Sequence, residues 1–304
     1  MTMETPSVYE GNYKKLKVGL CQVFTKAWAV QDNVKRTIAA IEQAAEMGAD
    51  IAVTPECVLD GYAGLDIFDN DMPKDLWQKL IAISEPLDGE NVIRLREKAK
   101  ELGIYVLLGF VERGRDGEIY NSAALISRQG EIIDTYHKVH CRPFEDKKRD
   151  GLYMTGEKYS VYDIKTSDCQ FKGGTIICFD REIPESTRCL RALGAEIIFC
   201  PLATNTADMA ERKGIERVDN EIITRCRAAE NEVFIVVVNH AGRFNGGSFI
   251  VGPSGELLCQ MGREADVHVV EVPVEVVCKK FHNNPLGWMG WGYRRGDVYS
   301  KYLK

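Results

Sequence analysis

The chain has 304 residues, of which 45% are hydrophobic and 28% are charged, which is typical of a globular protein with a sizeable core. Its formal net charge of −6 argues against nucleic acid as a partner. No apolar run approaches the ~20 residues that a membrane-spanning helix needs, so we expect no membrane association either.

The ten cysteines do not resemble a disulfide framework. Cys21, Cys57 and Cys200 lie inside apolar runs, which is typical of reduced, buried thiols. The N-terminal stretch carries Glu4 and Glu10 and shows no long apolar segment of the kind found in secretory signals. These features predict a cytoplasmic protein.

Strands and helices alternate along the first part of the chain. An alternating apolar pattern predicts a strand over Leu16–Val23, with Val18 and Leu20 on one face. Apolar residues at helical spacing predict a helix over Val34–Met47, and a short buried strand follows at Ile51–Thr54. A strand, a helix and a second strand in this order are typical of a parallel βαβ unit.

The middle of the chain continues this alternation. The segment Asp60–Met72 is rich in Gly, Asp and Asn and is predicted to be a loop. A helix is expected over Glu90–Leu102 and a buried strand over Ile104–Val111. The stretches Asn121–Ser127 and Glu131–Tyr136 form a predicted hairpin.

The stretch Gly173–Glu185 organises the rest of the chain. It reads as a short apolar strand that turns sharply into a helix, with Cys178 at the turn and Pro184 at an early helical position. A thiol held there lies close to a helix N-terminus, whose dipole and free N–H groups favour the thiolate. We therefore interpret Cys178 as a nucleophile.

The remaining elements extend the α/β pattern. We expect a helix over Gly214–Asn231 and strands over Tyr159–Ile164, Glu196–Cys200, Val233–Val238, Ser248–Val251, Glu256–Cys259 and Val267–Val272. No linker interrupts them, so we predict a single domain over residues 1–304, with a core of 15–278 and a tail of 279–304. Trp288 and Trp291 in that Gly-rich tail are interpreted as packing residues.

Two further predicted segments end in residues suited to chemistry. Glu56 follows the strand that ends near Thr54, and Lys138 follows the predicted hairpin. Because ligands in α/β folds bind beyond the carboxyl ends of strands, we expect Glu56, Lys138 and Cys178 to converge. A carboxylate beside a thiol can take its proton as the sulfur attacks an amide or nitrile carbon.

The long polar loop His137–Lys158 admits a second interpretation. His137, His140 and Cys141 could form a metal cluster, but the segment is not an evident helix and no matching fourth ligand stands out. We favour loop residues that flank Lys138, and we predict neither a metal nor an organic cofactor. Cys57, next to Glu56, is interpreted as a core residue.

These motifs resemble those of the nitrilase (carbon–nitrogen hydrolase) superfamily in the same order, over nearly the whole chain. The resemblance implies a four-layer α-β-β-α sandwich, with Glu56 as general base, Lys138 as catalytic lysine and Cys178 as nucleophile. Glu145, seven residues after Lys138, matches the second glutamate of many members. Lys138 and the backbone N–H of Phe179 would stabilise the oxyanion, and Glu145 would orient Lys138 or the substrate amine.

The residues after Cys178 bear on the substrate. Phe179, Arg181 and Glu182 are predicted to shape the binding pocket. Arg181 resembles the carboxylate-binding arginine of N-carbamoyl-D-amino acid hydrolases, although Glu182 stands where those enzymes have a second arginine. Arg181 and Glu182 could instead pair with each other or with protein groups. Nitrilases usually have Trp-Glu after the cysteine, whereas this chain has Phe179-Asp180.

The resemblance therefore implies a hydrolase of a small linear amide or N-carbamoyl compound that forms a cysteine thioester and releases ammonia. The alternatives are a nitrilase, an acyltransferase that passes the acyl group to an amine, and a non-catalytic scaffold, which the complete Glu-Lys-Cys set disfavours. The resemblance also implies a homodimer or a larger homo-oligomer.

Overall fold

The computed structural model describes residues 9–70, 73–167, 169–204, 220–283 and 290–302, which form two six-stranded sheets. The first sheet has the strand order β12 (Asp266–Val272), β1 (Leu16–Gln22), β2 (Ile51–Val53), β3 (Tyr105–Arg113), β4 (Ile119–Ile126) and β5 (Ile132–His137). The second has the order β11 (Leu257–Gln260), β10 (Phe249–Val251), β9 (Phe234–Val238), β8 (Ile197–Pro201), β7 (Gln170–Thr175) and β6 (Val161–Lys165).

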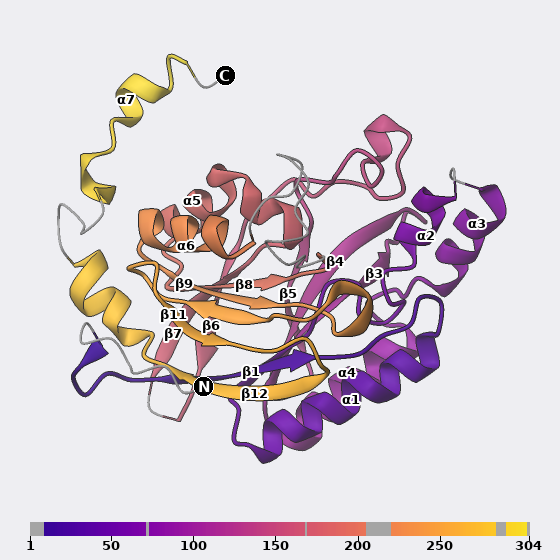
Figure 1. The fold of residues 1–304 in the computed structure, drawn as a ribbon, viewed down its shortest axis with the longest axis horizontal. Helices are drawn as coiled ribbons and strands as arrows, with labels where there is room; N and C mark the ends of the chain where they lie inside the picture. Colours follow the sequence, from indigo (N-terminus) through magenta and orange to yellow (C-terminus); the bar gives the residue numbers. More distant parts are fainter. Residues whose placement is uncertain (1–8, 71–72, 168, 205–219, 284–289, 303–304) are drawn as a thin grey trace.

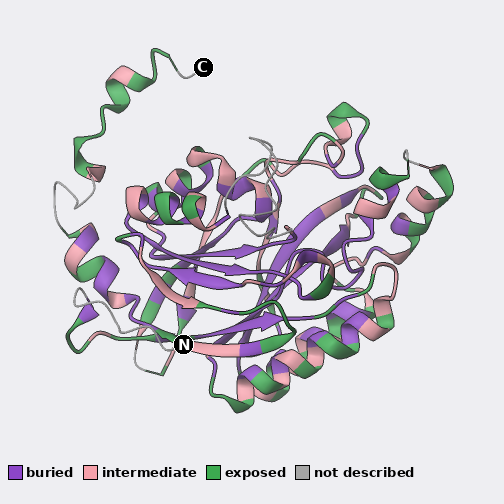
Figure 2. Ribbon diagram, in the orientation of Figure 1, coloured by how far each residue is buried: buried purple, intermediate pink, exposed green. Residues whose placement is uncertain are grey.

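A layer of helices covers the outer face of each sheet (Figure 1). Helices α1 (Val30–Glu46) and α4 (Glu90–Leu102) pack on the first sheet, and α5 (Pro184–Ala192) and α6 (Asn220–Asn231) cover the second. The strands between these layers are mostly buried, whereas the helices carry both buried and exposed positions (Figure 2). The predicted four-layer α-β-β-α sandwich is confirmed.

Strand β1 shows how the sequence pattern builds two of these layers. Leu16, Val18 and Leu20 point into the core between the sheets, whereas Cys21 belongs to the core beneath α1 and α4. A Cβ atom on Gly19 would lie 2.8 Å from the Cβ of Ala44 on α1. The absent side chain therefore lets this helix approach the sheet closely.

Strand direction brings the candidate residues to one end of the sandwich. Strands β1, β2 and β3 are parallel, and β5 shares their direction because β4 is antiparallel to both of its neighbours. Strands β7, β8 and β9 are also parallel to one another. The two sheets meet at this end, where the Ala241 N–H donates to the Val23 carbonyl at 3.0 Å, just beyond β9 and β1.

Most predicted elements are confirmed, including the helix Glu90–Leu102 and the β4–β5 hairpin. The loop prediction for Asp60–Met72 was wrong, because α2 (Gly64–Asp69) forms there, and α3 (Lys74–Ile83) follows it. The carboxylate of Asp60 accepts the N–H of Ala63 at 2.7 Å, so polar residues that suggested a loop begin a helix instead.

Several segments differ from the expectation only at their boundaries. Helix α1 begins at Val30, four residues before the predicted start. The first part of the predicted helix Gly214–Asn231 lies outside the described residues, as does Trp288. The short helices are η2 (Lys147–Arg149), η3 (Cys178–Glu182), η5 (Gly242–Phe244), η6 (Val277–His282), η7 (Trp291–Tyr293) and α7 (Gly296–Tyr299).

All ten cysteines are free, and Cys21, Cys57 and Cys200 are fully buried, as predicted. Within the described part of the chain, none of the helices combines the length and the apolar character that crossing a bilayer requires.

Candidate active site

The four residues predicted to carry the chemistry come together where the two sheets meet. Glu56 follows β2, Lys138 follows β5, Glu145 lies in the loop after Lys138, and Cys178 follows β7. The side chains of Glu56, Lys138 and Glu145 are fully buried, and Cys178 is 5% exposed. Three charged groups at this depth require mutual compensation, because an unpaired buried charge is costly.

Lys138 provides that compensation. Its ammonium donates to Glu56 Oε1 at 2.8 Å and to Glu145 Oε1 and Oε2 at 2.9 and 2.8 Å. Despite the opposing effect of burial, the charges of Glu145 and Glu56 raise the pKa of Lys138 well above its usual value. The lysine is therefore an ammonium ion fixed between two carboxyl groups.

Two residues that the sequence did not single out complete the hydrogen bonds of these carboxyl groups. The amide of Asn121, on β4, donates to Glu56 Oε1 at 2.7 Å and to Glu145 Oε1 at 3.2 Å. The Tyr62 hydroxyl donates to Glu145 Oε1 at 2.9 Å. Both side chains are buried; Asn121 bridges the two carboxyl groups, and Tyr62 holds Glu145.

The two glutamates are electrostatically unequal. Burial and the nearby charge of Glu145 raise the pKa of Glu56, only partly offset by Lys138. The pKa of Glu145 is lowered, because Lys138 and the donors Arg142 N–H and Tyr62 outweigh its burial. Glu56 Oε2 is buried and has no hydrogen-bond partner among the described residues. Glu56 is thus the carboxyl group suited to exchange protons, and Glu145 remains a fixed anion.

Cys178 lies on a strained turn. Its φ of 46° is in the left-handed region, which is unfavourable for a residue with a side chain. The turn joins β7, through Ile176 and Ile177, to η3 and then to α5, where Pro184 is the first residue as predicted. This strand–turn–helix geometry presents the sulfur at the end of the sheet, and Sγ lies 3.4 Å from the Thr204 hydroxyl.

A helix N-terminus favours the thiolate, but burial dominates at Cys178 in the resting protein. Burial, reinforced by the negative charge of Glu56, raises the pKa of Cys178 to about 12. The thiol is therefore protonated at neutral pH, and its activation requires a base during the reaction.

Asp180 connects the lysine segment to the cysteine turn. Its Oδ2 accepts the Tyr136 hydroxyl at 2.8 Å and the Ile177 N–H at 3.0 Å. Its Oδ1 accepts the His140 N–H at 2.7 Å. Tyr136 and His140 each lie two residues from Lys138, and Ile177 directly precedes Cys178. One buried carboxylate thus fixes the position of the lysine relative to the cysteine.

The backbone that carries Glu56 is held as tightly. Cys57 has a φ of 48°, so a second left-handed residue adjoins the site. Gly109 on β3 lies against this turn: a Cβ atom there would be 2.3 Å from the Pro55 carbonyl oxygen. The His240 ring, beyond β9, lies with Nε2 2.6 Å from the Glu56 carbonyl oxygen.

The residues considered for a metal cluster take separate partners. His137 pairs with Glu112 at 3.0 Å, His140 with Asp180 at 2.9 Å, and Cys141 Sγ lies 3.8 Å from the Lys138 carbonyl oxygen. No group of three potential metal ligands occurs within the described ranges.

The three predicted pocket residues differ in placement. Phe179 is partly exposed beside Cys178, and the Arg142 guanidinium lies 5.8 Å from its ring centre. Glu182 is also partly exposed. Arg181, in contrast, is fully buried and donates to Asn220 Oδ1 at 2.6 Å. This burial favours the alternative that Arg181 pairs with protein groups.

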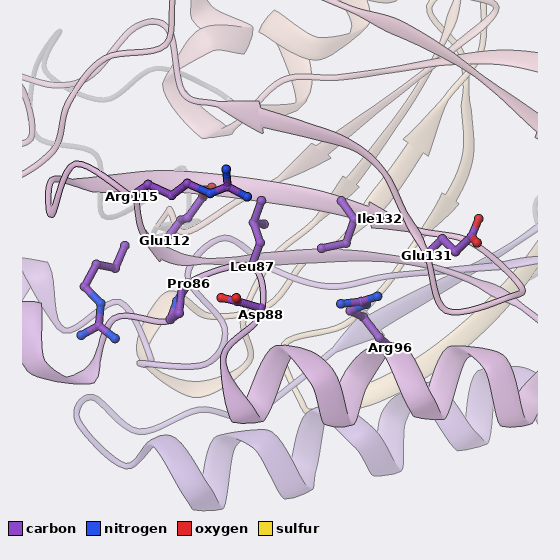
Figure 3. Close-up of a pocket in the computed structure, with 9 residues that line it drawn as sticks. Pro86, Leu87, Asp88, Arg96, Glu112, Arg115, Glu131 and Ile132 are labelled. Atoms are coloured by element: carbon purple, nitrogen blue, oxygen red, sulfur yellow. The ribbon is translucent and has the colours of Figure 1, made fainter.

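A separate groove of about 410 Å³ lies between α4 and the strands of the first sheet (Figure 3). It mixes arginines with carboxylates, and none of the predicted site residues lines it. The lining residues are Pro86, Leu87, Asp88, Arg96, Glu112, Arg113, Arg115, Glu131 and Ile132.

The pKa shifts predict an asymmetric dependence of kcat/KM on pH. A base must be deprotonated to act, so with Glu56 in that role activity should fall as pH decreases through its raised pKa, at a pH above 4.5. The Cys178 thiol, with a pKa of about 12, should cause no decline between pH 7 and 9. Initial rates of ammonia release from pH 4 to 10, after preincubation controls for stability, test this profile. A midpoint at or below 4.5, or a decline between pH 7 and 9, would contradict it.

His240 predicts an effect of pH on stability. Burial lowers its pKa from 6.5 to about 4, so the unfolded chain binds a proton more readily than the folded one. This contribution to the free energy of unfolding is complete above pH 6.5 and is lost as pH falls towards 4. The loss is about 3 kcal/mol in total, of which about 2 kcal/mol is lost by pH 5. Urea unfolding of the wild type and His240→Gln at pH 7.5 and 5 measures it. Between pH 7.5 and pH 5, the free energy of unfolding should fall by about 2 kcal/mol less in the variant than in the wild type. Equal decreases in the two proteins would refute the prediction.

Comparison with known proteins places this architecture in a family. A family model described as carbon–nitrogen hydrolase matches residues 17–279. An (R)-stereoselective amidase from Pseudomonas sp. is 30% identical over 266 residues, 86% of each chain. An N-carbamoylputrescine amidase from Solanum lycopersicum is 27% identical over 93% of this chain and 95% of its own length.

A solved structure shows the same fold. It is a mutant of the amidase from Nesterenkonia sp. AN1, with the acetamide moiety of fluoroacetamide covalently added at the active site cysteine. Its TM-score is 0.71 at 22% identity, over 96% of this chain and 98% of that chain. The chain belongs to the carbon–nitrogen hydrolase family. It is an enzyme that hydrolyses carbon–nitrogen bonds.

Proposed function

We propose that this enzyme hydrolyses a small linear amide or N-carbamoyl compound through a thioester on Cys178 and releases ammonia. The observation that carries the proposal is the buried arrangement of Glu56, Lys138 and Glu145 next to a protonated thiol. The names of the two relatives, an amidase and an N-carbamoylputrescine amidase, support the same substrate class. Phe179 and Asp180 after the cysteine favour amides over nitriles.

In the first half of the reaction, Glu56 takes the proton of Cys178 as Sγ bonds to the amide carbon. The Lys138 ammonium and the Phe179 N–H, at the start of η3, stabilise the negative oxygen that develops. Glu56 then passes its proton to the amide nitrogen, the C–N bond breaks, and ammonia leaves. The acyl group remains on sulfur as a thioester.

In the second half, water replaces ammonia. Glu56 takes a proton from that water, and the hydroxyl group bonds to the thioester carbon. The carbon–sulfur bond breaks, Glu56 returns that proton to Cys178, and the acid leaves. Glu145 acts throughout by orienting Lys138, because both of its oxygens already accept hydrogen bonds from that residue.

A panel of amides, N-carbamoyl compounds and nitriles, scored by ammonia release, tests the proposal. We expect turnover of at least one amide or carbamoyl compound and labelling of Cys178 by iodoacetamide. A parallel series with an added amine separates hydrolysis from acyl transfer, because transfer yields a substituted amide instead of the acid. Turnover of nitriles alone, or of no compound in the panel, would overturn the assignment.

We also propose that the enzyme assembles as a homodimer or a larger homo-oligomer through the face of α5 and α6. A cavity of about 530 Å³ lies between these helices and the tail, where the Arg191 guanidinium lies 4.5 Å from the Trp291 ring centre. Leu193, at the end of α5, is 49% exposed. Sedimentation equilibrium of the full chain and of Leu193→Asp tests this: the wild type should be oligomeric, and a monomer would refute it.

A cytoplasmic location completes the proposal. Its support is that all ten cysteines are free, since free thiols are typical of proteins in a reducing compartment. Fractionation of the cells that make the enzyme would test it.

A further inference from the structure

We propose that two consecutive residues beyond β9, Asn239 and His240, are positioning residues that hold both reacting partners: His240 fixes the base Glu56, and Asn239 fixes the nucleophile Cys178 through Thr204. This inference rests on the roles of Glu56 and Cys178 in the proposed function. It assigns residues of the second sheet to the alignment of a base that belongs to the first.

His240 reaches across the seam between the sheets. Its ring is fully buried, with Nε2 2.6 Å from the Glu56 carbonyl oxygen and Nδ1 2.8 Å from the Thr25 hydroxyl. A carbonyl oxygen only accepts hydrogen bonds, so Nε2 carries the proton and Nδ1 accepts the Thr25 hydroxyl. The ring is neutral, in agreement with its pKa of about 4.

The hydrogen bond from His240 reaches Glu56 beyond the end of β2, where the strand's own hydrogen bonds no longer hold the chain. Strand β2 ends at Val53, and the left-handed φ of 48° at Cys57 redirects the chain immediately after Glu56. Within that turn, the Glu56 carbonyl is held by His240. Losing this hydrogen bond frees the peptide that carries the base, and a displacement of about 1 Å in a reacting group can cost ~10² in rate.

Asn239 acts on the other reacting partner. Its amide donates to the Thr204 carbonyl at 2.9 Å, and its Oδ1 accepts the Thr204 N–H at 3.3 Å. The same amide donates to the carbonyl oxygens of Phe244 and Gly246 at 3.0 and 2.8 Å. The Thr204 peptide is thereby fixed, and its hydroxyl lies 3.4 Å from Cys178 Sγ.

Hydrogen bonds between the ends of the two sheets hold Asn239 and His240 in place. The next residue, Ala241, donates its N–H to the Val23 carbonyl at 3.0 Å, and the Ser248 hydroxyl donates to Gln22 at 2.8 Å. The Asn239 N–H in turn donates to that serine oxygen at 3.0 Å. The ends of β1 and β9 are therefore joined on both sides of the pair, and the distance between base and thiol is set across the two sheets.

The test measures kcat, KM and the rate of Cys178 alkylation by iodoacetamide at pH 7. His240→Leu removes the donor and should lower kcat about 10–100-fold with little change in KM. His240→Gln places an amide N–H near the former Nε2 and should restore most of kcat. Val237→Ala, on the buried strand β9, is the matched control: it weakens the core but should leave kcat unchanged below its unfolding temperature.

Alkylation separates the role of His240 from that of Asn239. It requires no turnover, so its rate can also be measured in inactive variants. In a Glu56→Gln background, His240→Leu should no longer slow alkylation, whereas Asn239→Leu should still slow it. In a Thr204→Val background, Asn239→Leu should no longer slow alkylation, whereas His240→Leu should still slow it. Circular dichroism and thermal melting identify the folded variants to compare.

Several results would overturn the inference. The first is a loss of kcat in His240→Leu that is no larger than the loss in Val237→Ala. The second is a His240→Gln enzyme whose kcat does not recover. The third is an equal effect of His240→Leu and Asn239→Leu on the alkylation rate in both the Glu56→Gln and the Thr204→Val backgrounds. Failure of the proposed function is distinguishable from these results, because it would appear as wild-type protein without turnover on any amide or carbamoyl compound.

Discussion

Replacement of Cys178 by alanine is expected to abolish turnover, with a loss of at least about 10⁴-fold in kcat, while the protein remains folded. Under the proposed function, Cys178 supplies the sulfur of the thioester, and alanine has no nucleophilic atom to replace it. Alanine and cysteine both carry a Cβ, so the cost of the left-handed φ of 46° is the same in the two proteins. The thermal midpoint should therefore change little.

Ammonia release and circular dichroism measure the two halves of this prediction. Cys226→Ala is the matched control, because that thiol is exposed on α6 and lies in no part of the site. It should retain full activity. An active Cys178→Ala enzyme, or an inactive Cys226→Ala enzyme with native stability, would contradict the assignment of the nucleophile.

Replacement of Lys138 by methionine is expected to reduce both activity and stability. Under the proposed function, the substitution removes the ammonium that stabilises the developing oxyanion, and losing one such group typically costs about 10²–10³ in rate. It also leaves Glu56 and Glu145 buried without the cation that contacts both at 2.8–2.9 Å. Breaking a buried ion pair in this way costs about 3–5 kcal/mol.

The two effects can be separated. In Lys138→Met, a buried carboxylate without its cation binds a proton more tightly, so this variant should recover stability as pH falls. The double variant Lys138→Met/Glu145→Gln removes one of the facing charges and should regain stability at pH 7 but not activity. Urea unfolding and initial rates provide the measurements. Full activity in the double variant would show that the lysine serves only to compensate charge.

The sequence predicted the parts of the fold that depend on local pattern. The alternation at Val18 and Leu20 and the helix Glu90–Leu102 are confirmed because each element's burial follows its own periodicity. The segment Asp60–Met72 was mistaken for a loop because the helix there is short and begins with polar residues. Tertiary packing stabilises such a helix, and a local pattern does not show it.

The site likewise has residues that the sequence predicted and residues that it did not. Glu56, Lys138 and Cys178 each end a strand, so their convergence follows from topology. Asn121 and His240 escaped notice because each acts on a partner far away in sequence, 65 and 184 residues in the two contacts with Glu56. No local spacing encodes such a contact. Buried polar residues close to strand ends were the available signal.

The arrangement of the first sheet has a consequence for synthesis of the protein. Strand β1 leaves the ribosome among the first elements, but its antiparallel partner β12 (Asp266–Val272) is among the last. At ~5–20 residues per second, roughly 12–50 s separate the two strands. During that interval the backbone N–H and carbonyl groups along one edge of β1 have no strand to pair with, which makes the nascent chain prone to aggregation. Chaperone demand should therefore be greatest just before the ribosome reaches the codons of β12.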